Sequence, residues 1–268
     1  MHFLSLDIIN TRYQDFLGTL FSPTRPTLIF TPNPEMLLRA ARDTEFLAIL
    51  SQADVLTPDA NGLYTASLMQ EGSGFLSACL QTLTMKKQLR AKYGDIITGS
   101  NLTRDLVSHA IESGKKILMI DNYRITDPQN PFEIEKKSVQ SHLRELFRER
   151  FPRLDIAVFF DREESPQELA TYIQEQHISY VFSCIGMKAQ EQRLIEIWAH
   201  LPSDQRVVGL GVGSSFDYLL GLQKRAPIFV QKLGLEWLYR LALSPRARWH
   251  RIVDAFYRFP QMIQDTPK

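Results

Sequence analysis

The sequence contains little cysteine, and its cysteines are far apart. Cys79 and Cys184 are the only two in 268 residues. Two cysteines do not make a disulfide framework, and neither stands at a spacing typical of metal ligands. The six histidines are scattered, without metal-ligand spacing. The sequence therefore predicts no disulfide-stabilised secreted domain and no metal centre, and a reduced chain in the cytoplasm is expected.

Long apolar runs are absent too. No stretch reaches the roughly 20 apolar residues that cross a bilayer. Asp7 interrupts the apolar start and no cationic segment precedes it, so no signal peptide is predicted. Any contact with a membrane is therefore expected to be peripheral.

The chain has almost no net charge, but its charge is unevenly distributed. The formal net charge is +1, and hydrophobic and charged residues make up 44% and 23%, as in soluble globular proteins. This balance argues against a globally basic nucleic-acid-binding protein. From Gly221 to the end, however, nine Lys and Arg stand against three Asp and Glu. The C-terminal segment is therefore locally cationic.

Short apolar segments alternate with longer amphipathic ones as far as Gly221. Strands are expected at residues 27–30, 54–57, 116–120, 155–160, 180–185 and 206–210. Helices are expected over 35–50, from Leu63, and after Ser165-Pro-Gln-Glu168, which has the form of a capping box. Continuous apolar strands separated by helices predict an α/β fold: an open, mostly parallel sheet sandwiched by helices, Rossmann-like in arrangement. The segment 72–87 is less regular, and an insertion or a mobile flap is expected there.

Polar residues and glycines follow these strands directly. In open α/β sheets, ligands bind outside the carboxyl ends of the strands. The residues that should then lie close together are Thr31, Asn33, Asp59, Asn61, Gly186, Gln190 and Gly213.

Each of these segments has a structural interpretation beside the functional one. Asp59 could be a general base for a sugar hydroxyl, or an N-cap or turn aspartate. Thr31-Pro-Asn-Pro34 could be a rigid polar site or a plain strand-to-helix connection. The backbone N–H groups of Gly186-Met-Lys-Ala-Gln-Glu191 could meet phosphate or sugar oxygens, or simply begin a helix. Gly209-Leu-Gly-Val-Gly213 only loosely matches a dinucleotide-binding loop.

The segment after Gly221 is basic and aromatic, which predicts a boundary between a 1–221 α/β core and a 222–268 C-terminal helical appendage. Arginine suits a diphosphate, and a basic aromatic helix suits an anionic membrane surface. Nucleic acid is an alternative without a recognised motif, and so is a helical pair docked on the core. The same apolar and aromatic surface could also pair subunits into a homo-oligomer. The candidate diphosphate or membrane contacts are Arg225, Arg240, Arg246, Arg248 and Arg251.

Several motifs, taken in order, resemble the WecG/TagA/CpsF family of glycosyltransferases over most of the chain, most strongly from Tyr180 to Arg251. The motifs are Thr31-Pro-Asn-Pro-Glu35, Asp59-Ala-Asn-Gly62, Gly99-Ser-Asn-Leu102, Gly186-Met-Lys-Ala-Gln-Glu191, Phe216-Asp217, Arg225-Ala-Pro227 and Leu233-Gly-Leu-Glu-Trp-Leu-Tyr-Arg240.

The resemblance implies a function. An N-acetylhexosamine, such as N-acetylmannosamine, would pass from a UDP-sugar donor to a polyprenyl-diphosphate-linked acceptor sugar in cell-surface polysaccharide synthesis, as in teichoic acid linkage. The reaction would invert the anomeric centre and use no metal ion or other cofactor. The protein would associate peripherally, through its appendage, with the inner face of the cell membrane, and nucleic acid would not be a partner.

The resemblance also implies roles for particular residues. Asp59 would deprotonate the acceptor hydroxyl, Thr31 and Asn33 would hold the sugar or the acceptor, and Gln190 would contact the donor. The arginines of the appendage would neutralise the departing UDP diphosphate. The further candidate substrate-binding residues are Asn61, Gly62, Ser100, Gly186, Glu191 and Gly213.

The sequence departs from the family pattern at several points. Ala60 replaces the first glycine of an Asp-Gly-x-Gly motif, and Lys188-Ala189 stands near the family's Pro-Lys pair. The turn after Ile120 lacks the family's glycines, and the region 72–95 is longer than usual. A catalytically impaired nucleotide-sugar-binding or scaffold protein is therefore the alternative function.

Overall fold

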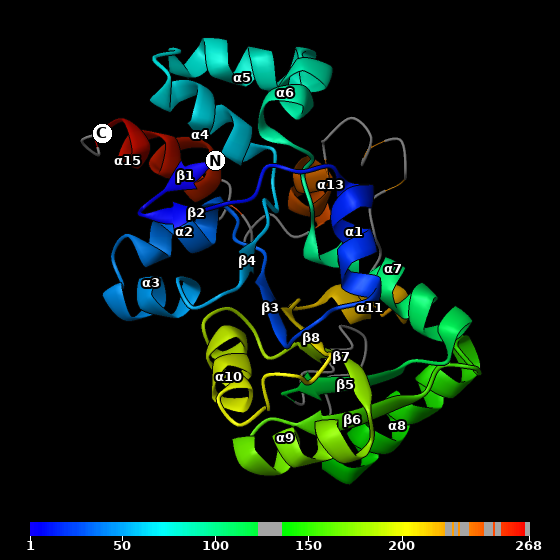
Figure 1. Cartoon of the computed structure of the whole chain (residues 1–268). Helices are drawn as coiled ribbons and strands as arrows, with labels where there is room; N and C mark the ends of the chain where they lie inside the picture. Colours follow the sequence, from blue (N-terminus) through cyan, green and yellow to red (C-terminus); the bar gives the residue numbers. More distant parts are fainter. Residues whose placement is uncertain are drawn as a thin grey trace.

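A six-stranded parallel sheet forms the centre of the protein (Figure 1). The computed structural model describes residues 1–122, 136–222, 227, 230, 236–243, 249 and 253–265. The strand order is β4-β3-β8-β7-β5-β6. The strands are β3 (Thr27–Phe30), β4 (Val55–Leu56), β5 (Lys116–Asp121), β6 (Ile156–Phe160), β7 (Ile178–Ser183) and β8 (Val208–Gly211). All neighbouring strands pair in parallel, which confirms the predicted α/β class.

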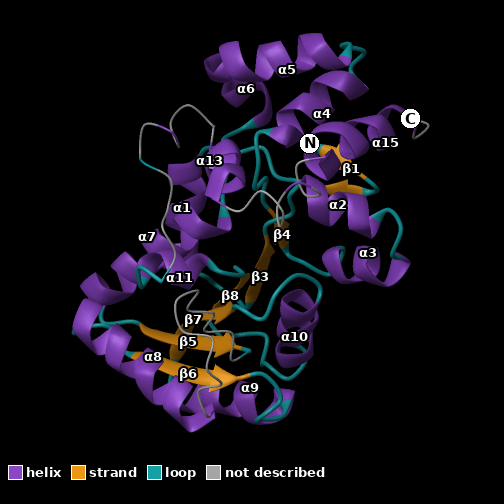
Figure 2. Ribbon diagram, turned by 180° about the vertical axis from the view of Figure 1, so that it is seen from behind, coloured by secondary structure: helices purple, strands orange, loops and turns teal. Residues whose placement is uncertain are grey.

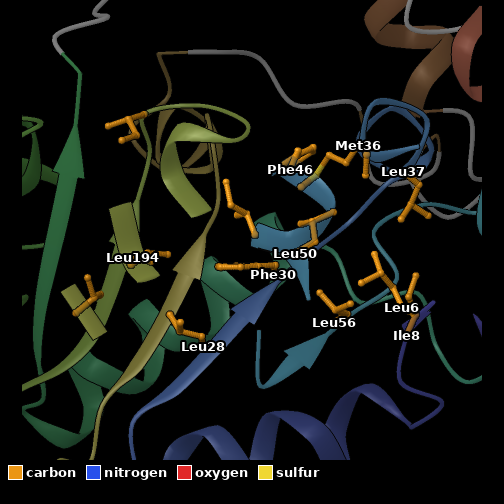
Figure 3. Packing of buried hydrophobic residues seen from close by; sticks show 14 of the residues in the cluster. Leu6, Ile8, Leu28, Phe30, Met36, Leu37, Phe46, Leu50, Leu56 and Leu194 are labelled. Atoms are coloured by element: carbon orange, nitrogen blue, oxygen red, sulfur yellow. The ribbon is translucent and has the colours of Figure 1, made fainter. Parts of the chain in front are cut away.

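Successive side chains along each strand enter two different cores, as the period of two in a strand requires. Leu28 and Phe30 pack under one layer of helices, and Ile29 packs under the other. The first layer contains α2 (Pro34–Ala40), α3 (Thr44–Leu50), α9 (Pro166–Glu175) and α10 (Ala189–Trp198), and part of it is drawn in Figure 3. The second contains α1 (Tyr13–Phe21), α7 (Gly99–Ser113), α8 (Lys136–Arg150) and α11 (Ser215–Leu219). Burial on both faces explains why the strand sequences are continuously apolar.

The expected helix at 35–50 is two helices. Asn33 caps α2, and Asp43 begins α3 by accepting a hydrogen bond from the Phe46 backbone N–H at 3.0 Å. Each cap satisfies a backbone donor that a helix start leaves unpaired. The predicted capping box at Ser165 is confirmed, because Ser165 and Glu168 bond reciprocally at the start of α9.

The segment expected to be an insertion or a mobile flap is helical. After α4 (Gly62–Gln70) come α5 (Phe75–Thr84) and α6 (Lys86–Tyr93), which stack beyond the end of β4 (Figure 2). These three helices share a small separate core that includes Tyr64, Leu89 and Tyr93. A short antiparallel pair near the N-terminus, β1 (His2–Phe3) and β2 (Leu6–Asp7), was also not predicted.

The end of the chain packs against the core. A π-helical turn, η1 (Asp254–Arg258), leads into α15 (Phe259–Asp265), which contacts α2 and α4. Phe259 and Ile263 are buried in the same cluster as Phe30. The preceding helix α13 (Glu236–Leu243) is described as well. The boundary at residue 221 stays a prediction, although Gly221 takes a positive φ of 71° there. In the part of the chain that the structure describes, no helix is both long and apolar enough to cross a bilayer.

We expect Gly209→Ala to destabilise the fold. A Cβ atom at residue 209 would lie 2.4 Å from the Trp198 ring, so β8 and α10 would have to separate. The free energy of unfolding should fall by about 1–3 kcal/mol, a typical cost of overpacking. Urea denaturation followed by circular dichroism measures it. Gly18→Ala is the matched control, because a Cβ atom there meets nothing within 4 Å and should stabilise α1 by about 0.5–1 kcal/mol.

Candidate active site

The carboxyl ends of the strands gather the predicted site residues at one edge of the sheet. Strands β4, β3, β8 and β7 are consecutive neighbours, and they end just before Asp59, Thr31, Gly213 and Gly186, respectively. The topology therefore brings together four segments that lie far apart in the sequence.

Asp59 lies in a loop that the neighbouring loop holds in place. The Thr57 backbone N–H donates to the Phe30 carbonyl at 2.9 Å, and the Asp59 N–H donates to the Pro32 carbonyl at 3.2 Å. The Asp59 side chain is half-buried, neither sealed inside nor fully in solvent. The N-cap residue of α4 is Asn61, two residues after Asp59.

Thr31 lies against the first residue of α7, Gly99, which precedes Ser100. Gly99 lies so close to Thr31 that a Cβ atom there would be 3.2 Å from the Thr31 Oγ1 and 3.9 Å from the Val212 Cα. Thr98 caps α7 by accepting from the Asn101 N–H at 3.2 Å, and its Oγ1 lies 3.3 Å from the Ser100 Oγ. Two hydroxyl-bearing residues and the start of a long helix thus adjoin the end of β8.

Asn33 and Gly62 lie at the starts of two adjoining helices. The Asn33 Oδ1 accepts from the Met36 N–H at 3.0 Å, so this oxygen is engaged in capping α2. A Cβ atom at Gly62 would lie 3.0 Å from the Pro34 ring, which shows how closely α4 and α2 approach. Asn61, the N-cap of α4, makes no side-chain capping bond.

Gln190 and Glu191 form a buried polar network behind the ends of β7 and β8. The Gln190 Oε1 accepts from the Gly213 N–H at 2.9 Å, and its Nε2 donates to the Glu191 Oε1 at 2.6 Å. The other Glu191 oxygen accepts from the Lys188 N–H at 2.7 Å. Both side chains are buried and directed at protein partners, so in this structure they position the loops around the site.

The glycines of β8 serve this packing. Gly209 and Gly211 are two residues apart and therefore face the same layer, which α10 covers. A Cβ atom at Gly211 would lie 2.9 Å from the Gln190 Nε2, and one at Gly209 would overlap Trp198. Gly213 adopts a φ of 51°, a conformation that glycine takes without steric cost. The glycine spacing at the end of β8 thus comes from the approach of α10.

Burial raises the pKa of Glu191 to about 7, although hydrogen bonds from Gln190 and the Lys188 N–H partly oppose the shift. Lys188 itself takes a positive φ of 72°. Its Nζ pairs with the Asp43 Oδ2 at 2.8 Å and the Glu45 Oε2 at 2.7 Å, which ties the β7–α10 loop to the start of α3.

The chain matches one glycosyltransferase family along nearly its whole length. The sequence model of the glycosyl transferase WecG/TagA/CpsF family matches residues 1–265. The chain belongs to this family.

Three relatives share the name N-acetylglucosaminyldiphosphoundecaprenol N-acetyl-beta-D-mannosaminyltransferase. The protein of Bacillus spizizenii is 28% identical over 254 residues, which cover 93% of this chain and 85% of the relative. The protein of Bacillus subtilis is 27% identical over 228 residues, which cover 85% of this chain and 75% of the relative. A relative from Staphylococcus aureus is 23% identical over 257 residues, which cover 93% of this chain and 85% of the relative.

The site also contains residues to which sequence reasoning gave no role. Asp121 ends β5, and burial raises the pKa of its carboxyl. The neighbouring Asn122 donates from Nδ2 to the Ile185 carbonyl at 2.9 Å, and so holds the turn that precedes Gly186. Burial, with the negative charges of Asp121 and Asp217 nearby, raises the pKa of the Cys184 thiol well above its usual range. In the sequence, the polar pair Asp121-Asn122 at the end of an apolar run is the feature that could have indicated this position.

The five arginines expected to contact a diphosphate or a membrane remain untested. Residues 225, 246, 248 and 251 and the side chain of Arg240 lie outside the described residues. Among the residues that are described, no group of three or more His, Cys, Asp or Glu is arranged to hold a metal ion.

We expect the contribution of Glu191 to the stability of the protein to fall as the pH rises from about 4.5 to about 7. The pKa of Glu191 is about 7 in the folded protein, against 4.5 for an ordinary glutamate, so the folded state binds the extra proton across that interval. Stability from this group is fully present below the lower value and is lost on the way to the higher one. The loss is up to about 3 kcal/mol. Urea denaturation at a series of pH values measures it.

Glu191→Gln should remove this pH-dependent component, since glutamine does not titrate. Glu149→Gln, at an exposed position at the end of α8, should leave the wild-type profile unchanged. The same slope in Glu191→Gln and the wild type would show that another group titrates.

Proposed function

We propose that this protein is an inverting glycosyltransferase that moves an N-acetylhexosamine from a UDP-sugar to a sugar linked to a polyprenyl diphosphate. The observation that carries the proposal is Asp59: a half-buried carboxylate at the carboxyl edge of the sheet, whose backbone N–H bonds to the Pro32 carbonyl, in a chain of a glycosyltransferase family. Its position matches the place where open α/β sheets bind ligands.

The substrates are inferred from the relatives. The name of these relatives specifies an N-acetylglucosaminyldiphosphoundecaprenol acceptor and an N-acetylmannosaminyl group. By this relation, the acceptor is a lipid-diphosphate-linked sugar and the transferred sugar is N-acetylmannosamine or a close analogue. A lipid-linked acceptor requires the protein to work at a membrane surface, on the cytoplasmic face, where nucleotide sugars are available.

In the proposed reaction, Asp59 takes the proton from an acceptor hydroxyl while that oxygen attacks the anomeric carbon of the donor. The bond between this carbon and the phosphate oxygen of UDP breaks, and the bonding electrons leave with UDP. A single displacement from the opposite side inverts the anomeric centre. A positioned general base contributes typically 10²–10⁴-fold in rate.

The negative charge that develops on UDP needs partners. Backbone N–H groups at the start of a helix are favourable for anions. The start of α7 adjoins the same sheet edge and would supply such groups. The arginines of the appendage would add charge-assisted hydrogen bonds to the diphosphate. In this proposal Gln190 and Glu191 keep the loop at Gly213 in place, while Thr31, Asn33, Asn61, Gly62, Ser100 and Gly186 line the substrate site.

We expect Asp59→Asn to reduce transfer by at least about 100-fold, because the amide accepts no proton. Circular dichroism and the unfolding midpoint should stay close to wild type, since the side chain is not part of the core. Asp155→Asn is the matched control: Asp155 is exposed and precedes β6, at the opposite edge of the sheet. Near-normal turnover in Asp59→Asn would exclude Asp59 as the base.

We also expect a donor screen to identify a UDP-N-acetylhexosamine, with inversion at the transferred sugar. Purified protein, a panel of UDP-sugars and a short-chain lipid-diphosphate acceptor are incubated with EDTA. Product formation is followed by mass spectrometry, and the anomeric configuration by NMR coupling constants. UDP binding without transfer from any donor would favour the alternative of an impaired nucleotide-sugar-binding or scaffold protein, which Ala60 motivates.

A further inference from the structure

Helix α5 turns its large apolar side chains toward solvent. Leu76, Leu80 and Leu83 are 81%, 62% and 56% exposed, and their spacing places them on one side of the helix. Phe75 and Met85, at the two ends of α5, are exposed as well. We call these five residues the α5 face.

The inward side of α5 fixes this orientation. Ala78 and Thr82 are buried against α4, and the Thr82 Oγ1 lies 2.9 Å from the Thr65 Oγ1. The Thr82 hydroxyl also bonds to the Ala78 carbonyl at 2.9 Å. Small residues and a buried hydroxyl pair thus pack inside, while leucines lie outside, which is the reverse of an ordinary amphipathic surface helix.

The segment around the α5 face is cationic. Residues 72–94 contain four basic residues and no acidic one. Lys92 pairs with Glu71, and Arg90 with Asp95 at 3.5 Å, both partners lying just outside the segment. Lys87 is exposed at the start of α6, two residues after Met85. An apolar stripe flanked by lysine is typical of helices that lie in the headgroup region of anionic membranes.

The α5 face is also connected directly to the candidate active site. Helix α4 begins three residues after Asp59 and leads to α5, and Figures 1 and 2 show α4, α5 and α6 stacked beyond the end of β4. A nine-residue helix is about 13 Å long. A surface on α5 is therefore within a short distance of the strand ends.

We infer that the α5 face, with Lys87 beside it, docks on an anionic lipid bilayer and holds the site near a membrane-embedded acceptor. The choice of a bilayer over a second copy of the chain has two reasons. A symmetric pairing through α5 would bring the Lys86-Lys87 pairs of two copies close to each other, whereas anionic headgroups complement them. The second reason, the lipid-linked acceptor, rests on the proposed function. The residues of this surface, 75–87, do not belong to the 222–268 segment.

The test uses full-length protein and vesicles of phosphatidylcholine with 30% phosphatidylglycerol, a composition chosen as on the order of natural anionic content. Co-sedimentation measures the bound fraction. The wild type should bind, and L76S/L80S/L83S should bind at least tenfold more weakly. L76M/L80M/L83M, which keeps the apolar surface, is the matched control and should bind like the wild type. Lys87→Glu should weaken binding to these vesicles but not to pure phosphatidylcholine.

Because the three leucines are exposed, the serine variant should keep the wild-type circular dichroism and unfolding midpoint. Wild-type vesicle binding by L76S/L80S/L83S, or no binding by the wild type, would overturn the inference. So would a wild-type dimer in size-exclusion chromatography that the serine variant converts to a monomer with unchanged vesicle binding, which would make the α5 face a protein interface.

Activity separates this inference from the proposed function. The serine variant should keep wild-type transfer to a short-chain, water-soluble acceptor and lose transfer to a long-chain acceptor embedded in vesicles. Vesicle binding that depends on the leucines, in a protein with no transferase activity on either acceptor, would refute the proposed function and leave the docking surface standing.

Discussion

All six strands of the central sheet run in one direction, and helices cover both of its faces. Strand interiors such as Ile29, Phe30 and Leu210 are therefore sealed in apolar cores. Polar groups can reach a ligand only where the strands end, and parallel strands all end at the same edge. This constraint collects Thr31, Asp59, Gly186 and Gly213 from distant parts of the sequence into one place.

The loops at that edge are held by a buried polar network. Burying a carboxylate away from water costs free energy unless the carboxylate is hydrogen-bonded. Glu191 accepts hydrogen bonds from both the Lys188 N–H and the Gln190 amide. Gln190 in turn holds the Gly213 N–H. Gly209 and Gly211 leave room for α10 to come close enough for this contact. Burial of Glu191 beneath this loop raises the pKa of its carboxyl to about 7.

The proposed chemistry needs an aqueous nucleotide sugar and a lipid-linked acceptor at the same residue, and the arrangement of α4 and α5 meets this need. The helix that begins just after Asp59 leads directly to the helix whose leucines face solvent. The small core shared by α4, α5 and α6 keeps these elements in a fixed relation. In the proposed docking, the orientation of the membrane surface relative to the candidate base thus comes from ordinary helix packing.

The sequence by itself determined the strands, the α/β class and the edge at which the site lies, because runs such as residues 27–30 and 116–121 are apolar enough to be buried whatever surrounds them. It also determined the family, through motifs in a fixed order. Only the tertiary structure decided how Gln190 and Glu191 are used, since a glutamine and a glutamate at a helix start read the same whether they face a ligand or the interior. It likewise decided that residues 75–84 form a helix with its leucines outward. The local pattern of a segment specifies that its helix has two different sides, but the side that is buried depends on the neighbouring element. In α5 the buried side is the one with Ala78 and Thr82, because these small residues fit against α4 and the Thr82 hydroxyl meets that of Thr65.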